Sequence, residues 1–125
     1  MSLPLKQIEN NMTAGTYDIT IDQGSDYSLG LILKDNLGSP MDLTGYSARA
    51  QLRPKKDSTV LSASFTCSIS SPPTDGEIIM SLPNAISTAM NAGTYYYDLE
   101  VYTPGDSYVA RIIEGKARIK QEVTR

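Results

Sequence analysis

Two carboxylates, Asp98 and Glu100, lie two residues apart in a run of alternating residues and therefore on one face of a predicted strand. Glycosidases use a pair of carboxylates held at a defined separation in a cleft, so this spacing is a candidate for hydrolysis. Asp18 and Asp22 form a second set on the polar side of an earlier predicted strand. Both sets continue the ordinary alternation of a solvent-facing side, and no run of aromatic residues marks a cleft beside them. We therefore expect that the protein is not an enzyme.

The other common catalytic chemistries lack their side chains. The chain has no His, which excludes Ser-His-Asp and Cys-His catalysis and His-ligated metals. The single cysteine, Cys67, cannot form an intrachain disulfide or a thiolate metal site. It alternates with apolar residues, which favours a small core residue over a nucleophile. The glycines never take a phosphate-binding spacing, and we expect no cofactor.

Four aspartates lie near the ends of predicted strands, where oxygen ligands for calcium can gather. They are Asp22, Asp26, Asp35 and Asp42. No EF-hand spacing links them, and Asp is also a common turn residue because its side chain accepts hydrogen bonds from nearby backbone amides. The turn interpretation is favoured, and no metal site is predicted.

The charge of the chain is unevenly distributed. The whole chain carries a net charge of -3, but residues 107–125 hold five basic and two acidic residues, a net +3 that leaves -6 for the rest. This pattern fits either a solvated strand face with a basic tail or a docking edge for an acidic partner. The candidate contacts in this segment are Arg111, Lys116, Arg118 and Lys120.

Nucleic-acid and membrane partners are not expected. Arg53, Lys55 and Lys56 cluster, but no stacking aromatic residues accompany them and the background is acidic. No apolar run approaches the roughly 20 residues of a membrane-spanning helix, and residues 1–15 lack the apolar region of a signal peptide.

Tyrosine is the dominant aromatic residue, with eight Tyr against one Phe and no Trp. Tyr96 and Tyr102 fall on the polar side of the strand that also carries Asp98. An exposed Tyr on a strand is typical of an interface anchor, and it is also typical of ordinary cross-strand pairing. We include both residues among the candidate partner contacts.

Period-two alternation dominates the chain and predicts about eight strands separated by turns. Residues 83–91 give the one helical pattern, with Pro83 at its start and Gly93 just past its end. Residues 1–13 are polar and are predicted to be a flexible arm, and residues 14–125 a single domain. The fold class predicted is all-β, an immunoglobulin-like antiparallel β-sandwich of about 7–8 strands, with a closed barrel as the alternative. The predicted strands are residues 16–22, 27–33, 46–53, 61–69, 77–82, 94–103, 107–113 and 117–123.

Gly93, Tyr95 and Tyr97 have the spacing of a tyrosine corner, in which a Tyr at the start of a strand folds back onto the preceding backbone. We expect the Tyr95 hydroxyl to bond to the segment 83–91. Tyr97 or Leu99 would then fill the core position where antibody domains carry Cys.

Two stretches carry a family resemblance. Residues 35–46 are D-N-L-G-S-P-M-D-L-T-G-Y, and residues 92–99 are A-G-T-Y-Y-Y-D-L. Together with the order of strands and turns over residues 17–124, they resemble small immunoglobulin-like proteins of tailed bacteriophages and prophages. The layout is similar to that of the N-terminal domain of phage baseplate upper proteins.

The resemblance implies a non-enzymatic structural protein of the virion, made in the bacterial host cytoplasm. Such a protein would be an adaptor or assembly module in a tail, baseplate or fibre. Its partners would be other virion proteins, and it would self-associate as a trimer or ring. Two alternatives stay open: a carbohydrate- or surface-binding module, and a head decoration protein.

Overall fold

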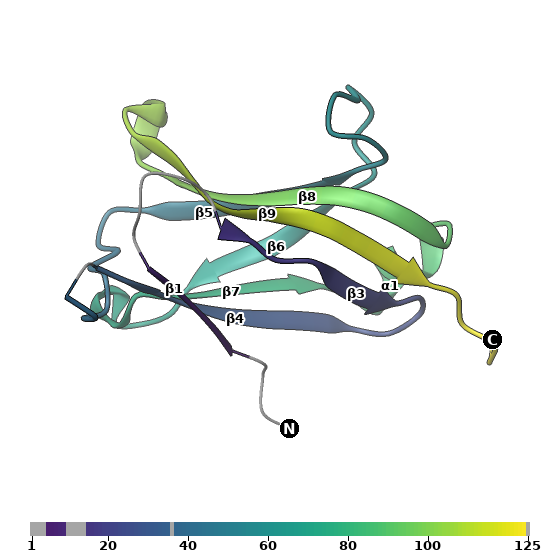
Figure 1. The fold of residues 1–125 in the computed structure, drawn as a ribbon, viewed down its shortest axis with the longest axis horizontal. Helices are drawn as coiled ribbons and strands as arrows, with labels where there is room; N and C mark the ends of the chain where they lie inside the picture. Colours follow the sequence, from purple (N-terminus) through teal and green to yellow (C-terminus); the bar gives the residue numbers. More distant parts are fainter. Residues whose placement is uncertain (1–4, 10–14, 36, 125) are drawn as a thin grey trace.

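The structure is a computed structural model that describes residues 5–9, 15–35 and 37–124 (Figure 1). Within these residues the chain forms strands, one short helix and two 3-10 turns. In chain order they are β1 (Leu5–Glu9), β2 (Gly15–Thr16), β3 (Ile19–Asp22), β4 (Tyr27–Lys34), β5 (Ser47–Arg53), β6 (Ala63–Ile69), η1 (Pro73–Asp75), β7 (Glu77–Leu82), α1 (Asn84–Ala89), β8 (Gly93–Tyr102), η2 (Pro104–Asp106) and β9 (Val109–Lys120).

The strands form one mixed sheet that curls until its two halves face each other. The order along the sheet is β1-β4-β7-β6-β5-β8-β9-β2, with β3 also paired to β9. Strand β6 joins the halves, because Phe65 pairs with Ala50 of β5 while Thr66 pairs with Ser81 of β7. The prediction of separate sheets in a sandwich is therefore not confirmed.

The prediction of an antiparallel sheet is wrong. Strand β1 runs parallel to β4, and β2 and β3 run parallel to β9. A tight turn forces antiparallel pairing only on consecutive strands. Strands β3 and β9 lie far apart in the sequence, so either direction is open to them. The alternation inside each strand reports which side is buried and not which way its neighbour runs.

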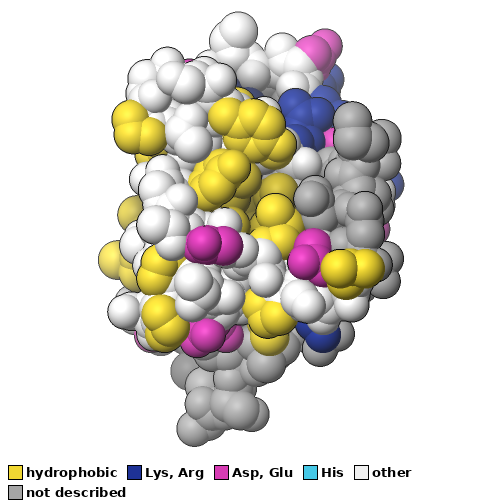
Figure 2. Space-filling model, turned by 90° about the vertical axis from the view of Figure 1, so that its left-hand side faces the viewer, with side chains coloured by type: hydrophobic (Ala, Val, Ile, Leu, Met, Phe, Trp, Pro, Cys, Tyr) yellow, Lys and Arg dark blue, Asp and Glu magenta, His cyan; other side chains and the backbone are white. Residues whose placement is uncertain are grey.

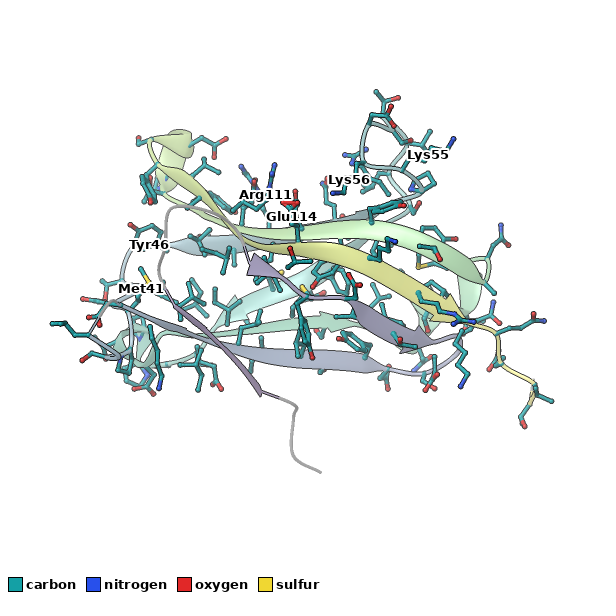
Figure 3. All side chains as sticks on the ribbon, viewed as in Figure 1. Met41, Tyr46, Lys55, Lys56, Arg111 and Glu114 are labelled. Atoms are coloured by element: carbon teal, nitrogen blue, oxygen red, sulfur yellow. The ribbon has the colours of Figure 1, made fainter. Side chains whose placement is uncertain are left out.

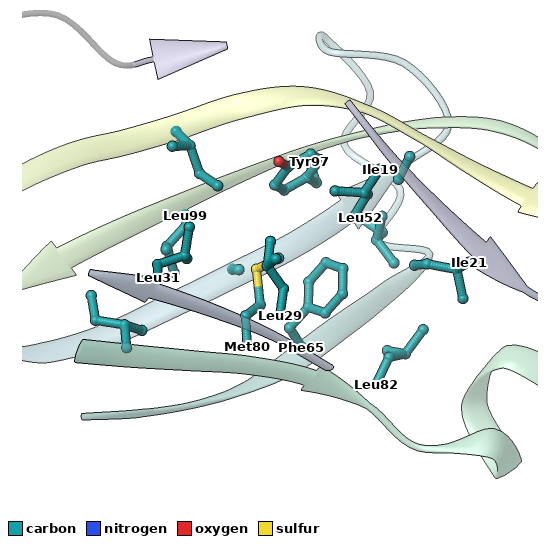
Figure 4. Packing of buried hydrophobic residues seen from close by; sticks show 14 of the residues in the cluster. Ile19, Ile21, Leu29, Leu31, Leu52, Phe65, Met80, Leu82, Tyr97 and Leu99 are labelled. Carbon is teal, nitrogen blue, oxygen red and sulfur yellow. The ribbon is translucent and has the colours of Figure 1, made fainter. Parts of the chain in front are cut away.

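The core fills the space between the two halves of the sheet (Figure 4). Leu31, Leu52 and Leu99 are fully buried, as the period-two pattern of their strands predicts. Each fully buried aliphatic side chain contributes roughly 1.5–3 kcal/mol to folding. Cys67 is half-buried against this core, and burial raises the pKa of its thiol to about 11. The thiol is therefore neutral at physiological pH, in agreement with a packing role.

The predicted helix is present as α1, and the residue that it buries is a serine. Ile86 is 41% exposed, whereas Ser87 is completely buried. The Ser87 hydroxyl donates to Ser25 O at 2.9 Å and accepts from Gly24 N–H at 3.1 Å. Helix α1 therefore contacts the turn after β3 through two hydrogen bonds of the Ser87 hydroxyl, one donated and one accepted. An apolar face of the helix does not make this contact.

The last two predicted strands are one strand, β9. The β8–β9 register shifts between Leu99 and Glu100, opposite Ile112. Gly115 is required because a Cβ there would lie 2.4 Å from Tyr17 O. The strand can pack this closely against the segment before β3 only without a side chain at this position.

The predicted arm over residues 1–13 stays a prediction. Five of its residues, Leu5–Glu9, are placed as β1 along β4. The remainder of the arm lies outside the described residues. Within the described part of the chain, no helix is long and apolar enough to cross a membrane.

Candidate protein-binding face

Strand β8 divides its side chains between two environments. Tyr97, Leu99 and Val101 are buried, while the residues between them point outward and are half-buried. We call the solvent side of β5, β8 and β9 the outer face. Its cross-strand rows are Arg53–Tyr96–Lys116, Gln51–Asp98–Glu114, Arg49–Glu100–Arg111 and Ser47–Tyr102–Val109.

Arg49 neutralises one part of the outer face. Its guanidinium forms an ion pair with Glu100 and a second with Asp106, whose Oδ1 lies 3.3 Å from Nη1. The same guanidinium lies 4.2 Å from the centre of the Tyr102 ring. The predicted contact residue Tyr102 is therefore already covered on one face by a cation of its own chain.

A second network surrounds Asp98 and Glu114, two acids that lie directly opposite each other on β8 and β9. Like charges in this position repel. Arg111 offsets the repulsion, with Nε 3.2 Å from Asp98 and Nη1 3.5 Å from Glu114, and Lys56 Nζ lies 3.7 Å from Glu114. Burial still raises the pKa of the Asp98 carboxyl, helped by Glu100 and Glu114 and opposed by Arg111. The predicted contact residue Arg111 is thus paired within the chain.

An open groove of about 340 Å³ lies over these networks. Figure 3 shows Arg111, Glu114 and Lys56 between two loops that rise from the sheet, one following β5 and one joining β8 to β9. The groove has charged side chains of both signs along its floor. It is lined by Arg49, Ala50, Gln51, Arg53, Lys56, Tyr96, Tyr97, Asp98, Glu100, Arg111 and Glu114.

The outer face changes character toward the end of β9. Lys116, Arg118 and Lys120 point outward and are exposed. Within the described ranges none of the three forms an ion pair, whereas Asp98, Glu100 and Glu114 of the preceding rows all do. Tyr96 lies in the same row as Lys116 and is half-buried. We call Lys116, Arg118 and Lys120, with Arg53 and Tyr96 beside them, the basic stripe.

The hydrogen bond expected from Tyr95 is present. Its Oη donates to Asn91 O at 2.8 Å, four residues upstream and directly after the helix. Gly93 has a φ of +146°, which favours glycine, and Tyr97 is buried and donates a hydrogen bond to Tyr17 O. The geometry of the three residues is that of a corner which orients β8 and so determines which residues reach the outer face.

The chain is similar in fold to the N-terminal domain of phage TP901-1 ORF48. The similarity spans 96% of this chain and 99% of that domain, with a TM-score of 0.56 and 9% sequence identity. At this identity the likeness concerns the fold alone. It extends over nearly the whole of both chains, so the strands that build the outer face fall within the aligned fold.

A second similarity has a lower TM-score. A cysteine protease inhibitor, EhICP2 of Entamoeba histolytica, aligns over 94% of this chain and 97% of its own, with 15% identity and a TM-score of 0.44. No protein-family model and no curated protein matches the sequence.

Three of the four aspartates considered for calcium, Asp26, Asp35 and Asp42, accept hydrogen bonds from nearby turns or from the start of α1. Asp35 Oδ1 accepts from Leu37 N–H and Ser39 N–H, and Asp42 Oδ1 accepts from Thr44. The bond from the Thr44 hydroxyl lowers the pKa of Asp42. Asp26 Oδ1 accepts from Asn84 N–H at the start of α1. Over residues 5–9, 15–35 and 37–124 there is no group of three potential metal ligands.

Arg49 and Asp106 are two ion-pairing residues of this face that the sequence did not single out. Alternation placed Arg49 on the polar side of its strand. Its partners Glu100 and Asp106 lie 51 and 57 residues away, and only the β5–β8 register brings them together. No spacing in the sequence encodes that register.

Proposed function

We propose that this chain is a structural component of a bacteriophage particle, an adaptor or assembly module of the tail, baseplate or fibre that acts through protein–protein contacts. The observation that carries the proposal is the end-to-end similarity to a phage protein domain, 96% of one chain on 99% of the other. The turn motifs of residues 35–46 and 92–99, which resemble phage proteins, support it independently.

We also propose that the fold is a variant of the immunoglobulin-like arrangement. Immunoglobulin domains have strands A, B, E and D in one sheet and C, F and G in the other. Here β1-β4-β7-β6 follow the first order and β5-β8-β9 the second. The Tyr95 bond between α1 and β8 lies where those domains have their tyrosine corner. The parallel β1 and the shared strand β6 are the departures from that plan.

The outer face is the surface that we assign to contacts. It combines a rigid sheet floor, two raised loops and a half-buried Tyr96, and Arg and Tyr are enriched at protein interfaces. The edges of the sheet are further candidates, since an unpaired strand edge invites strand addition. Virion proteins are the partners that this proposal requires.

Mass spectrometry of purified particles tests the proposal. We expect peptides of this chain to co-purify with the major virion proteins through a density gradient, at a constant ratio across the particle peak. A host cytosolic protein of similar abundance serves as the contamination control and should not follow the peak. Absence of the chain from the particles would contradict the proposal.

Two further measurements separate the alternatives. Immunogold labelling of the tail supports an adaptor, and labelling of the head would support a decoration protein instead. A glycan array tests the carbohydrate-binding alternative, which the Arg49 guanidinium on the Tyr102 ring disfavours because it occupies a face that a sugar would need. A hydrolase activity that is lost on Asp98→Asn would overturn the proposal of a non-enzymatic role.

A further inference from the structure

The basic stripe carries an electrostatic imbalance that the chain itself does not resolve. Lys116, Arg118 and Lys120 alternate along one side of β9, so their charges lie on the same face two residues apart. Arg53 bonds to Gln51 Oε1 and Ser58 O, which are neutral acceptors. Two acids lie beside the stripe: Asp18, whose Oδ1 accepts from Lys116 N–H, and Asp22, the parallel neighbour of Lys120. Within the described ranges neither forms an ion pair, and the four cations of the stripe outnumber them. The stripe therefore keeps an excess of positive charge.

The opposite end of the molecule has the complementary composition. Figure 2 shows apolar side chains gathered on this end with acidic side chains among them and basic side chains at the upper edge, and Figure 3 places Met41 and Tyr46 there. The Tyr108 ring contacts Tyr46 edge to face at 6.0 Å and is 54% exposed. Asp42 follows Met41, and Asp75 is brought near because Leu43 N–H bonds to Pro73 O.

We call Met41, Asp42, Tyr46, Asp75 and Tyr108 the acidic end. Neither Asp42 nor Asp75 forms an ion pair within the described part of the chain. Lys34 is the basic residue at this end of β4, and Asp35 and Glu77 outweigh it. The stripe lies toward the C-terminal end of β9 and the acidic end at the other extreme of the long axis (Figure 1).

We propose that the basic stripe is a docking surface for the acidic end of a second copy of this chain. Two copies in head-to-tail order bring opposite charges together, whereas head-to-head or tail-to-tail order brings like charges together. Such a contact joins two different surfaces, so each copy keeps one free surface of each kind. Repetition of the contact produces a ring where the rotation closes and an open assembly where it does not.

The two surfaces are complementary in the types of side chain they carry as well as in net charge. Lys and Arg bind the faces of aromatic rings, and the acidic end offers the rings of Tyr46 and Tyr108. The chain already makes this type of contact internally, with the Arg49 guanidinium 4.2 Å from the Tyr102 centroid. The Met41 and Tyr46 side chains provide an apolar centre, and the surrounding carboxylates provide orientation. The inference concerns the chain alone and does not depend on its presence in a virion.

Light scattering of the purified chain at high concentration tests the proposal. The monomer has a mass of 13.6 kDa. At about 20 mM salt, where the Debye length is on the order of 20 Å, we expect a weight-average mass well above this value; at about 0.5 M salt we expect the monomer. A wild-type chain that stays monomeric at low salt overturns the proposal.

Two variants reverse one surface each. Lys116→Glu/Arg118→Glu leaves Arg53 and Lys120 against the two introduced acids, Asp18 and Asp22, and so makes the stripe acidic. Asp42→Asn/Thr74→Lys/Asp75→Lys makes the acidic end basic. Asn at position 42 keeps the acceptor for Thr44 N–H, so the turn is retained. Each variant alone has two surfaces of like charge and should be monomeric. An equal mixture should assemble again, because every contact between unlike copies is then complementary.

The mixture distinguishes this proposal from docking of a different protein. Failure of the mixture to assemble, or assembly of either variant alone, overturns it. Far-UV circular dichroism checks that both variants are folded. If a reversal does not fold, Lys116→Ala/Arg118→Ala and Asp42→Asn/Asp75→Asn replace it, and each should lower the assembled fraction at low salt. Absence of that loss counts against the proposal, whereas absence from particles would affect only the proposed function.

Discussion

The two faces of the β8–β9 pair are built on the same backbone but stabilised in different ways. On the inner face, packing leaves no freedom: Tyr97, Leu99 and Ala117 are buried, and Gly115 has no room for a methyl group. On the outer face, half-exposed charges are balanced in some rows and unbalanced in the basic stripe. The comparison teaches that substitutions on the inner face should change the free energy of unfolding. Substitutions on the outer face should change it little and should act mainly on association.

The largest effect is expected for Gly115→Ala. The new Cβ would lie 2.4 Å from Tyr17 O, which is a backbone atom that cannot rotate away. Overpacking of this kind costs about 3 kcal/mol. Urea denaturation measures the loss. Gly15→Ala is the matched control on the parallel neighbour of β9, where the nearest atom is 3.8 Å away, and it should leave the midpoint almost unchanged. Equal midpoints for the two variants would refute the close approach.

The next effect concerns Tyr95→Phe, which removes the hydroxyl that donates to Asn91 O. One hydrogen bond is worth about 1 kcal/mol net, so the thermal midpoint should fall by the corresponding few degrees. Tyr96→Phe is the control on the opposite face of the same strand and should have no effect on the midpoint. No change for Tyr95→Phe would show that the corner does not stabilise the fold.

Arg49→Ala tests whether the balanced rows contribute to stability at all. It removes the pairs with Glu100 and Asp106 and the contact with the Tyr102 ring. Because the side chain is 41% exposed, solvent screening keeps the loss small, and added salt should shrink it further. Arg118→Ala is the unpaired control and should cost nothing measurable. A larger loss of stability for Arg118→Ala than for Arg49→Ala would contradict the claim that ion pairs stabilise the Arg49 rows and not the basic stripe.

The smallest expected effect is an increase in the free energy of unfolding, for Asp98→Asn. The pKa of Asp98 is raised in the folded state, so ionisation of this carboxyl destabilises the fold as pH rises through that pKa. Asp98→Asn should therefore be slightly more stable than wild type at neutral pH, by less than about 0.5 kcal/mol because the carboxyl is partly exposed. The difference should vanish below the ordinary pKa of 3.8, where the carboxyl is protonated in both states. Chemical denaturation at several pH values measures it, and a destabilised variant at neutral pH would contradict the assignment.

Features that depend on residues close together in the sequence were predicted, and features that depend on residues far apart were not. Alternation correctly placed Tyr97 and Leu99 inside, because a strand's two faces are encoded residue by residue. The Tyr95 bond spans four residues and was also expected. The parallel pairing of β3 with β9 was not, since it joins segments about a hundred residues apart, as the bond from Lys116 N–H to Asp18 shows.

The candidate contact residues also differ in whether their environment depends on distant parts of the sequence. The predicted contact residues Lys116, Arg118 and Lys120 are exposed, whereas Arg111 forms ion pairs that depend on the β8–β9 register. Ser87 was missed because a buried serine has no sequence signature; its role depends on Gly24 and Ser25, which lie more than sixty residues earlier. Local sequence patterns thus predicted on which side of a strand a residue lies. Which charged residues form ion pairs depends on the register between strands.

Amide NMR spectra of the wild-type chain, recorded on a dilute and a concentrated sample at low salt, test the central claim most directly. If the unbalanced cations form contacts between copies, concentration should shift the signals of Lys116, Arg118 and the loop that contains Asp42. The signals of the balanced residues Arg49 and Glu100 should stay in place. Shifts confined to the balanced rows, or spectra that do not change with concentration, would contradict the claim that the basic stripe is the contact surface.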